Sequence, residues 1–302
     1  MSAPDVATMP AEPQRYGEVY DRGYKHYDGE RLGRRHAFGA LIRYSIQRAL
    51  GLKKRWTAKV VPIIIYTVAA GAVLIMIGIE AFIDESTMSY ADFYLYIFAL
   101  LGLFVATTAP EMLCPDRREN VLSLYFARAI SRLDYVLAKL AAMAILTLTI
   151  SLVPHVLFWL FRQLLADDQL QAFRDNADQL GKIVVIGVLT AFYLGAIGLA
   201  ISSFTKRKPI AIAIIIVGWG VTEAFVGFFQ EAVKDESWSD YLFLLSPTSC
   251  VANLAYSLLA TTAELEEMDF SIALDWWWYA LSMVGTILIA CAIMVWRYVP
   301  EE

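Results

Sequence analysis

The chain has 302 residues, of which 58% are hydrophobic and 18% are charged, and its formal net charge is −5. Soluble domains usually contain about 45–50% apolar residues, so this composition argues against a water-soluble protein. The net charge is the sum of basic segments and acidic segments, so it says little about binding partners. We expect no nucleic-acid partner.

Six apolar stretches are long enough, at 1.5 Å per residue, to cross the roughly 30 Å hydrocarbon core of a membrane. In lipid the backbone must satisfy its own hydrogen bonds, so all six are expected to be helices. The predicted spans cover residues 60–83, 91–112, 135–161, 183–204, 209–229 and 276–298. The predicted fold class is therefore an all-α integral membrane protein with six transmembrane helices.

The region before the first span divides into two parts. Residues 1–20 have the polar, proline-containing composition of a disordered cytoplasmic tail. Residues 21–59 are expected to contain an amphipathic helix, because apolar residues such as Phe38 and Leu41 recur at helical spacing opposite a basic face. This helix would lie in the cytoplasmic interface and lead into a transmembrane domain of residues 60–298.

Charge alternates between the loops that connect the spans. The N-terminal arm, the loop after the second span and the turn Lys206–Lys208 are basic, whereas the segments after the odd-numbered spans are mainly acidic. By the positive-inside rule the basic segments face the cytoplasm. We predict a multi-pass protein of the inner or plasma membrane with both termini in the cytoplasm.

The loop between the second and third spans, residues 113–134, is too apolar for a passive linker and too short and charged to span a membrane. Residues such as Leu122 and Tyr125 share one helical face, with Arg128 and Arg132 outside it. The pattern predicts a short cytoplasmic helix with an exposed apolar side.

The loop between the fifth and sixth spans holds a moderately apolar run at residues 241–260, interrupted by Ser246 and Pro247. A seventh crossing here would place the basic C-terminal Arg297 outside, against the positive-inside rule. We therefore expect re-entrant or surface-lying helices on the outer side.

Ionisable residues within a span each cost roughly 2.5–3.5 kcal/mol on insertion scales, and three of them are candidates for a functional role. Glu223 is the deepest, His155 lies in the third span beside Pro154, and Glu80 lies near the outer end of the first. Glu223 and His155 either line a translocation path or make interhelical hydrogen bonds, and Glu80 is close enough to an interface to reach it. Pro154 is expected to kink the third span.

Motifs for chemistry are absent from the sequence. It has no phosphate-binding loop, no His-Glu-x-x-His, no Gly-x-Ser-x-Gly and no Cys-x-x-Cys. We therefore expect no catalytic residues, no metal site and no directly bound cofactor.

Three segments of the sequence share a pattern with a known family. The leader is Tyr27-Asp28-Gly29-Glu30-Arg31, and the outer segment is Leu245-Ser246-Pro247. The cytoplasmic loop contributes Asp116-Arg117-Arg118, Leu122-Ser123-Leu124-Tyr125, Ala127-Arg128, Ile130-Ser131-Arg132, Asp134-Tyr135 and Lys139-Leu140. In these segments the chain resembles ABC-2 type transporter permeases, the transmembrane subunits of prokaryotic ATP-binding cassette exporters.

The resemblance implies a permease that exports a substrate through a path at a dimer interface. One partner would be an ATP-binding subunit, present in two copies, which binds ATP and Mg²⁺. The other partners would be a second copy of the chain or a homologous permease, and membrane lipids. The loop would act as a coupling helix that docks on the ATP-binding subunit. The docking residues implied are Asp116, Arg117, Arg118, Tyr125, Arg128, Arg132 and Asp134.

Two alternatives remain open from the sequence. One is a non-transporting membrane scaffold or sensor whose basic arm binds anionic lipid or a partner. The other is an intramembrane lipid-modifying enzyme with His155 or Glu223 as the base, which would need a nucleophile or metal site that the motifs do not supply. The transported substrate is not specified by any motif.

Overall fold

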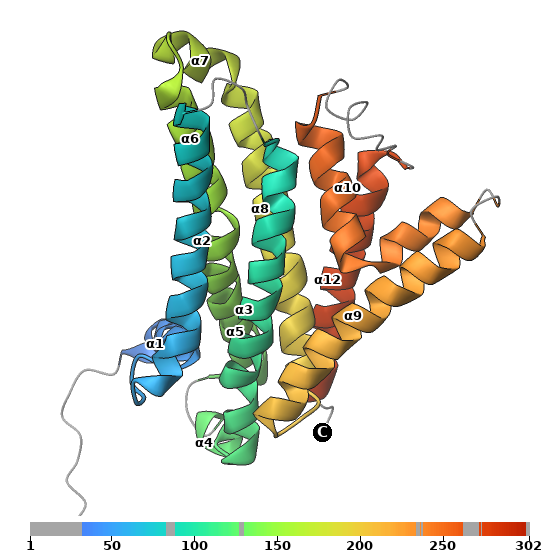
Figure 1. Ribbon diagram of the computed structural model, residues 1–302. Coiled ribbons are helices and arrows are strands. Elements are labelled where there is room, and N and C mark those ends of the chain that lie inside the picture. The colour runs from blue at the N-terminus through green and yellow to red at the C-terminus, as the bar shows by residue number, and fades with distance from the viewer. Residues whose placement is uncertain are drawn as a thin grey trace, which may run out of the picture. The chain divides into compact units, whose positions relative to one another are not determined.

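The computed structural model describes residues 32–82, 88–126, 130–233, 236, 238–261, 272 and 274–299 (Figure 1). These residues form helices and connecting turns, with no strand among them. The helices are α1 (Gly33–Ala49), α2 (Thr57–Phe82), α3 (Tyr90–Arg118), α4 (Leu122–Phe126), α5 (Arg132–Ser151), α6 (Val153–Leu165), α7 (Gln169–Asp175), α8 (Ala177–Ser202), α9 (Lys208–Ala232), the 3₁₀ helix η1 (Ser239–Leu245), α10 (Pro247–Leu259) and α12 (Trp276–Tyr298).

The prediction of six membrane-spanning helices is confirmed. Six helical segments are long and apolar enough to cross a membrane, and each overlaps one predicted span. They are Thr57–Phe82, Tyr90–Arg118, Arg132–Leu165, Ala177–Ser202, Lys208–Ala232 and Trp276–Tyr298. The third segment consists of α5 and α6, which are separated by Leu152. This break lies next to Pro154, the residue at which the sequence predicted a kink.

The centre of the bundle is built on α3 and α8, the two spans with the most buried residues. Glycines bring these helices close together, since a Cβ added at Gly198 would lie 2.3 Å from Cγ1 of Val105. A Cβ at Gly102 would meet the ring of Trp219 from α9. Most residues of α2, α9 and α12 are not buried by the rest of the chain, and the exposed side chains are largely apolar. Such surfaces are expected to face lipid or another protein in the membrane.

Within residues 21–59 the structure has the helix α1, and the buried side of this helix contacts protein. Leu41, Ser45 and Ala49 are buried, and α1 packs against α5 and α3. Arg35 and Arg43 lie on the exposed face. The predicted tail of residues 1–20 lies outside the described residues.

The apolar run between the fifth and sixth spans forms η1 and α10, which are bent by 108° at Ser246. Ser246 caps α10 by accepting a hydrogen bond from the Ser249 N–H, and Pro247 follows at the first turn. Most of α10 is buried against α3, α8 and α12. Figure 1 shows η1 running back from the end of α9 and α10 returning toward the end of the bundle where α12 begins. A bend of this size is that of a broken span or of a re-entrant loop, and this pair is not one of the six helices that are long and apolar enough to cross a membrane.

Candidate functional site

The first candidate is a buried ionic cluster around Asp116, which we call the Asp116 cluster and which consists of Asp116, Arg48, Tyr135 and Lys139. Arg48 Nη1 lies 2.8 Å from Asp116 Oδ1, and Lys139 Nζ lies 2.8 Å from Oδ2. The Tyr135 hydroxyl donates to Oδ2 over 3.0 Å, and Lys139 also donates to the Met112 carbonyl. The Asp116 and Lys139 side chains are fully buried, so this carboxylate joins α1, α3 and α5.

A second ion pair fastens the other end of α1. Arg34 donates from Nε and Nη2 to the two carboxylate oxygens of Asp134, over 2.7 and 2.8 Å. Asp134 also closes the capping box of α5, in which the Ser131 side chain accepts from the Asp134 N–H. The hydrogen bond to Asp134 raises the pKa of the Arg34 guanidinium. Two ion pairs, one near each end, therefore hold α1 against the bundle.

Side chains from the last turns of the α3 helix also contact two connecting segments, the one before α2 and the one between α8 and α9. Glu111 pairs with Lys54, from the turn before α2, and with Lys208, the first residue of α9. Arg117 donates to the Ser203 carbonyl at the end of α8. We call this end of the bundle, where α1, α4 and the turn of residues 203–207 meet the end of α3, the basic end.

The exposed surface of the basic end is formed partly by α4. Leu124 is 66% exposed, while the half-buried Tyr125 lies against Tyr135 with ring centroids 5.9 Å apart. Burial, with a smaller contribution from the nearby Asp116 carboxylate, raises the pKa of Tyr125 to about 12. Arg118 is exposed beside Glu119, and the Arg132 guanidinium lies over the Phe126 ring.

The predicted docking residues therefore fall into two groups. Asp116, Arg117 and Asp134 bind other segments of the chain, whereas Arg118 is exposed. Arg128 lies outside the described residues. Lys139 was among the residues that carry the family resemblance but was not predicted as a site residue, although its position four residues after Tyr135 places both on one face of α5.

Glu223 lies at the bend between η1 and α10. Its Oε1 accepts from the Thr248 N–H at 3.2 Å, from the Thr248 hydroxyl at 2.7 Å and from Trp219 Nε1 at 3.2 Å. Its Oε2 accepts from the Ser246 hydroxyl at 2.7 Å. A carboxylate at a helix N-terminus is favoured by the helix dipole. Glu223 thus fixes the start of α10 to α9. These contacts are the interhelical hydrogen bonds that were one of the two alternatives for Glu223.

His155 and Glu80 occupy separate places in the bundle. The His155 ring is buried, with Nδ1 2.6 Å from the Ser151 carbonyl and the ring stacked on Tyr94. Its Nε2 has no hydrogen-bond partner in the part of the chain that the structure describes. Glu80 pairs with Arg162 at 3.1 Å. The three ionisable residues predicted in the spans do not form one site.

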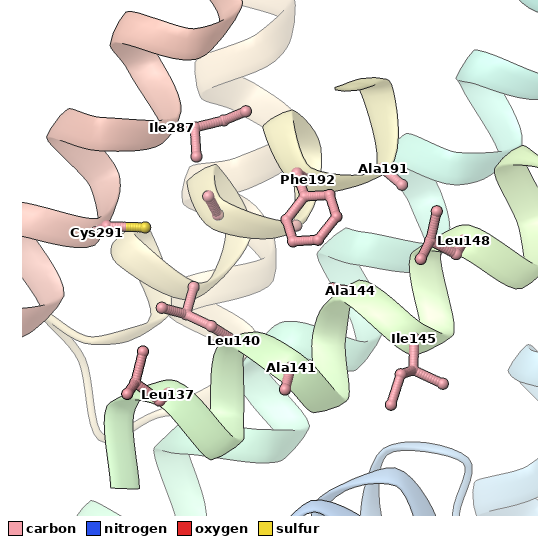
Figure 2. Close-up of a pocket in the computed structure, with 12 residues that line it drawn as sticks. Leu137, Leu140, Ala141, Ala144, Ile145, Leu148, Ala191, Phe192, Ile287 and Cys291 are labelled. Atoms are coloured by element: carbon pink, nitrogen blue, oxygen red, sulfur yellow. The ribbon is translucent and has the colours of Figure 1, made fainter. Parts of the chain in front are cut away.

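Two larger pockets lie between the spans. One, of about 490 Å³, is lined by residues of α3, α8, α9, η1, α10 and α12 and includes the hydroxyls of Thr222, Ser282 and Thr286. The other, of about 450 Å³ between α5, α8 and α12, has apolar walls that include Leu140 and Phe192 (Figure 2). Neither holds a pair of charged groups, and no group of three metal-ligating side chains is found among the described residues.

One comparison with known proteins gives a match. The family model described as ABC-2 family transporter protein matches residues 40–292, which include most of α1 and all of α2 to α10. No curated protein matches the chain.

Proposed function

The chain belongs to the ABC-2 family of transporter proteins, and on that premise we propose that it forms the export path of an ATP-binding cassette transporter powered by a separate ATP-binding subunit. Membership makes it a multi-pass membrane permease component. The proposal adds the direction of transport, the partner and the surface through which the partner acts.

The basic end supports docking of the partner. Leu124 exposes an apolar side chain on a helix that lies outside the six spans, and the cation Arg118, at the end of α3, is also exposed. Buried behind α4, the Asp116 cluster joins α1, α3 and α5 through charge-assisted hydrogen bonds. α4 meets this cluster through Tyr125, whose ring centroid lies 5.9 Å from that of Tyr135. A push on α4 would therefore be passed to the ends of α3 and α5. This link from an exposed surface to buried spans is the observation that carries the proposal.

The direction and orientation follow from charge and family. The positive-inside rule favours the basic end in the cytoplasm, where ATP and Mg²⁺ are available to the partner. Both termini would then be cytoplasmic. Export is what the ABC-2 resemblance implies for the direction of transport.

The path itself is proposed to lie between two permease chains. Only a small part of α9 is covered within this chain. One of its exposed sides carries the small residues Ala213, Gly220, Ala224 and Gly227, which permit close approach of another helix. We propose that a second copy, or a homologous permease, packs there, and that two ATP-binding subunits dock on the pair.

A matched pair of substitutions tests the docking surface. Leu124 on α4 and Leu170 on α7 are both 66% exposed, but α7 lies at the opposite end of the bundle (Figure 1). The tagged chain is purified from its native membrane, and the ATPase activity that co-purifies with it is measured. Leu124→Glu should lower this activity at least about tenfold, the equivalent of about 1.4 kcal/mol, while Leu170→Glu leaves it unchanged.

Equal activity in both variants and the unmodified chain would contradict docking through α4. A parallel loss in both would point to misassembly and would also remove support for the proposal. Elution volume on size exclusion identifies misassembly independently of the partner.

A further inference from the structure

A pocket lined by cations lies at the basic end, between the end of α3 and the turn that joins α8 to α9. Its volume is about 380 Å³. We call it the basic pocket, and its lining residues are Arg118, Lys206, Arg207, Lys208, Pro209 and Ile210. Four of the six side chains are positively charged, and no carboxylate lines the pocket.

The cations of the basic pocket exceed the carboxylates that neutralise them. Lys208 pairs with Glu111, and Arg118 lies 3.1 Å from Glu119. Within the described residues, the Lys206 and Arg207 side chains have no carboxylate partner. Two neighbouring positive charges without a carboxylate partner repel one another. Binding of an anion near both charges would offset this repulsion.

The location of the pocket indicates the kind of anion. Lys206 and Arg207 form the turn between two membrane-spanning helices, which places them at the level of lipid headgroups. The wall of the pocket continues onto α9 through Pro209 and Ile210. A ligand that bears a phosphate and also an apolar chain would fit both features.

An exposed apolar stripe on α9 leads away from the pocket. Ile210, Ile214, Val217 and Val221 recur at helical spacing on one side of α9, and each is between 43% and 61% exposed. At 100° per residue this stripe lies about 80° around α9 from the side that carries Gly220 and the other small residues.

We propose that the basic pocket binds the phosphate of an anionic glycerophospholipid, with an acyl chain along the α9 stripe. Lys206 and Arg207 contribute the unpaired charge, and Arg118 and Lys208 complete the cationic wall. Basic pockets between transmembrane helices on the cytoplasmic side bind the headgroups of anionic lipids. The proposal concerns the chain alone and does not depend on its transport function.

Native mass spectrometry of the full chain in detergent tests the proposal. Phosphatidylglycerol, phosphatidylcholine with the same acyl chains, dihexanoyl phosphatidylglycerol and inorganic phosphate are titrated separately. Long-chain phosphatidylglycerol should bind at least about tenfold more tightly than the other three probes. The preference over phosphatidylcholine tests the charge, and the preference over the short-chain lipid and phosphate tests the acyl track.

A double variant and a matched control locate the site. Lys206→Gln/Arg207→Gln should weaken binding of long-chain phosphatidylglycerol by at least about tenfold, because it removes the two cations that have no carboxylate partner among the described residues. Lys53→Gln/Arg55→Gln removes two exposed cations from the turn before α2 and should leave binding unchanged. All of these residues are exposed or at the surface, so both variants are expected to fold.

Three results would overturn the proposal. Equal weakening in both double variants would mean general attraction to a basic surface. Binding of inorganic phosphate or dihexanoyl phosphatidylglycerol as tight as that of the long-chain lipid would exclude the acyl track. Loss of a co-purifying ATP-binding subunit in Lys206→Gln/Arg207→Gln, with lipid binding unchanged, would assign the pocket to that partner.

Discussion

Replacing Asp116 by asparagine removes the carboxylate that two cations of the Asp116 cluster share. Arg48 and Lys139 would remain at the end of α3, where the Lys139 side chain is fully buried and the Arg48 side chain is 10% exposed. Asparagine has nearly the same volume as aspartate, so no cavity forms. The change therefore isolates the charge.

The expected cost follows from the burial of the pairs. Removing one partner of a buried ion pair destabilises a protein by about 3–5 kcal/mol, because the other charge stays buried without compensation. Glu119 compensates only in part, since it lies 3.6 Å from Arg48 and is half exposed. We expect Asp116→Asn to lower the free energy of unfolding by about 3–5 kcal/mol.

Lys139→Met is the informative comparison. It removes one buried cation and leaves the pair between Arg48 and Asp116 intact, with one charge of each sign. Its cost is the loss of hydrogen bonds to Asp116 and to the Met112 carbonyl, about 1–3 kcal/mol. Asp116→Asn should therefore be the more damaging of the two substitutions.

We would measure these differences in the free energy of unfolding by titrating the detergent-solubilised chain with sodium dodecyl sulfate. Tryptophan fluorescence reports the fraction unfolded. Circular dichroism of the starting material checks that each variant contains the same helices. Equal stability of Asp116→Asn and the unmodified chain would refute the reasoning. So would a larger loss in Lys139→Met than in Asp116→Asn.

Three further outcomes follow from the same structure. Glu223→Gln weakens the charge-assisted cap of α10 and should lower the free energy of unfolding by about 1–2 kcal/mol in the same titration; no change would exclude the capping role. The neutral phenol of Tyr125 stabilises the folded state below the unfolded pKa of about 10, and this stability is lost as the pH rises toward the folded pKa of about 12. Tyr125→Phe should therefore lose less stability between pH 10 and 12, and identical pH profiles would contradict this. Gly198→Ala forces a contact with Val105 and should destabilise the fold by about 1–3 kcal/mol, whereas Gly71→Ala, on α2 with no atom near the added Cβ, should be neutral or slightly stabilising by thermal melting.

The spans could be predicted from the sequence because length and apolar composition are sufficient in a membrane. Backbone groups in lipid have no partner outside the segment, so an apolar stretch of about 20 residues has few alternatives to a helix. For the interrupted run at 241–260 the positive-inside rule predicts re-entrant or surface-lying helices, and the structure divides this run into η1 and α10 at Ser246. Its burial against α3 and α12 depends on tertiary packing, which local sequence does not specify.

The contacts of the candidate site were less accessible to sequence reasoning. Asp116 was predicted as a docking residue, but its partner Arg48 lies 68 residues away and no local periodicity links the two. For Glu223 the sequence left a path-lining role and an interhelical role open. The hydrogen bonds to Ser246 and Thr248 favour the interhelical role, and they depend on the return of the chain at the bend.

The central claim is that this permease works as a pair with separate ATP-binding subunits. The most direct test is the mass of the complex that a C-terminally tagged chain carries from its native membrane, measured by native mass spectrometry. The account predicts two permease chains, or this chain with a homologous permease, together with two ATP-binding subunits. A chain isolated alone, with no ATP-binding subunit and no ATPase activity, would contradict it.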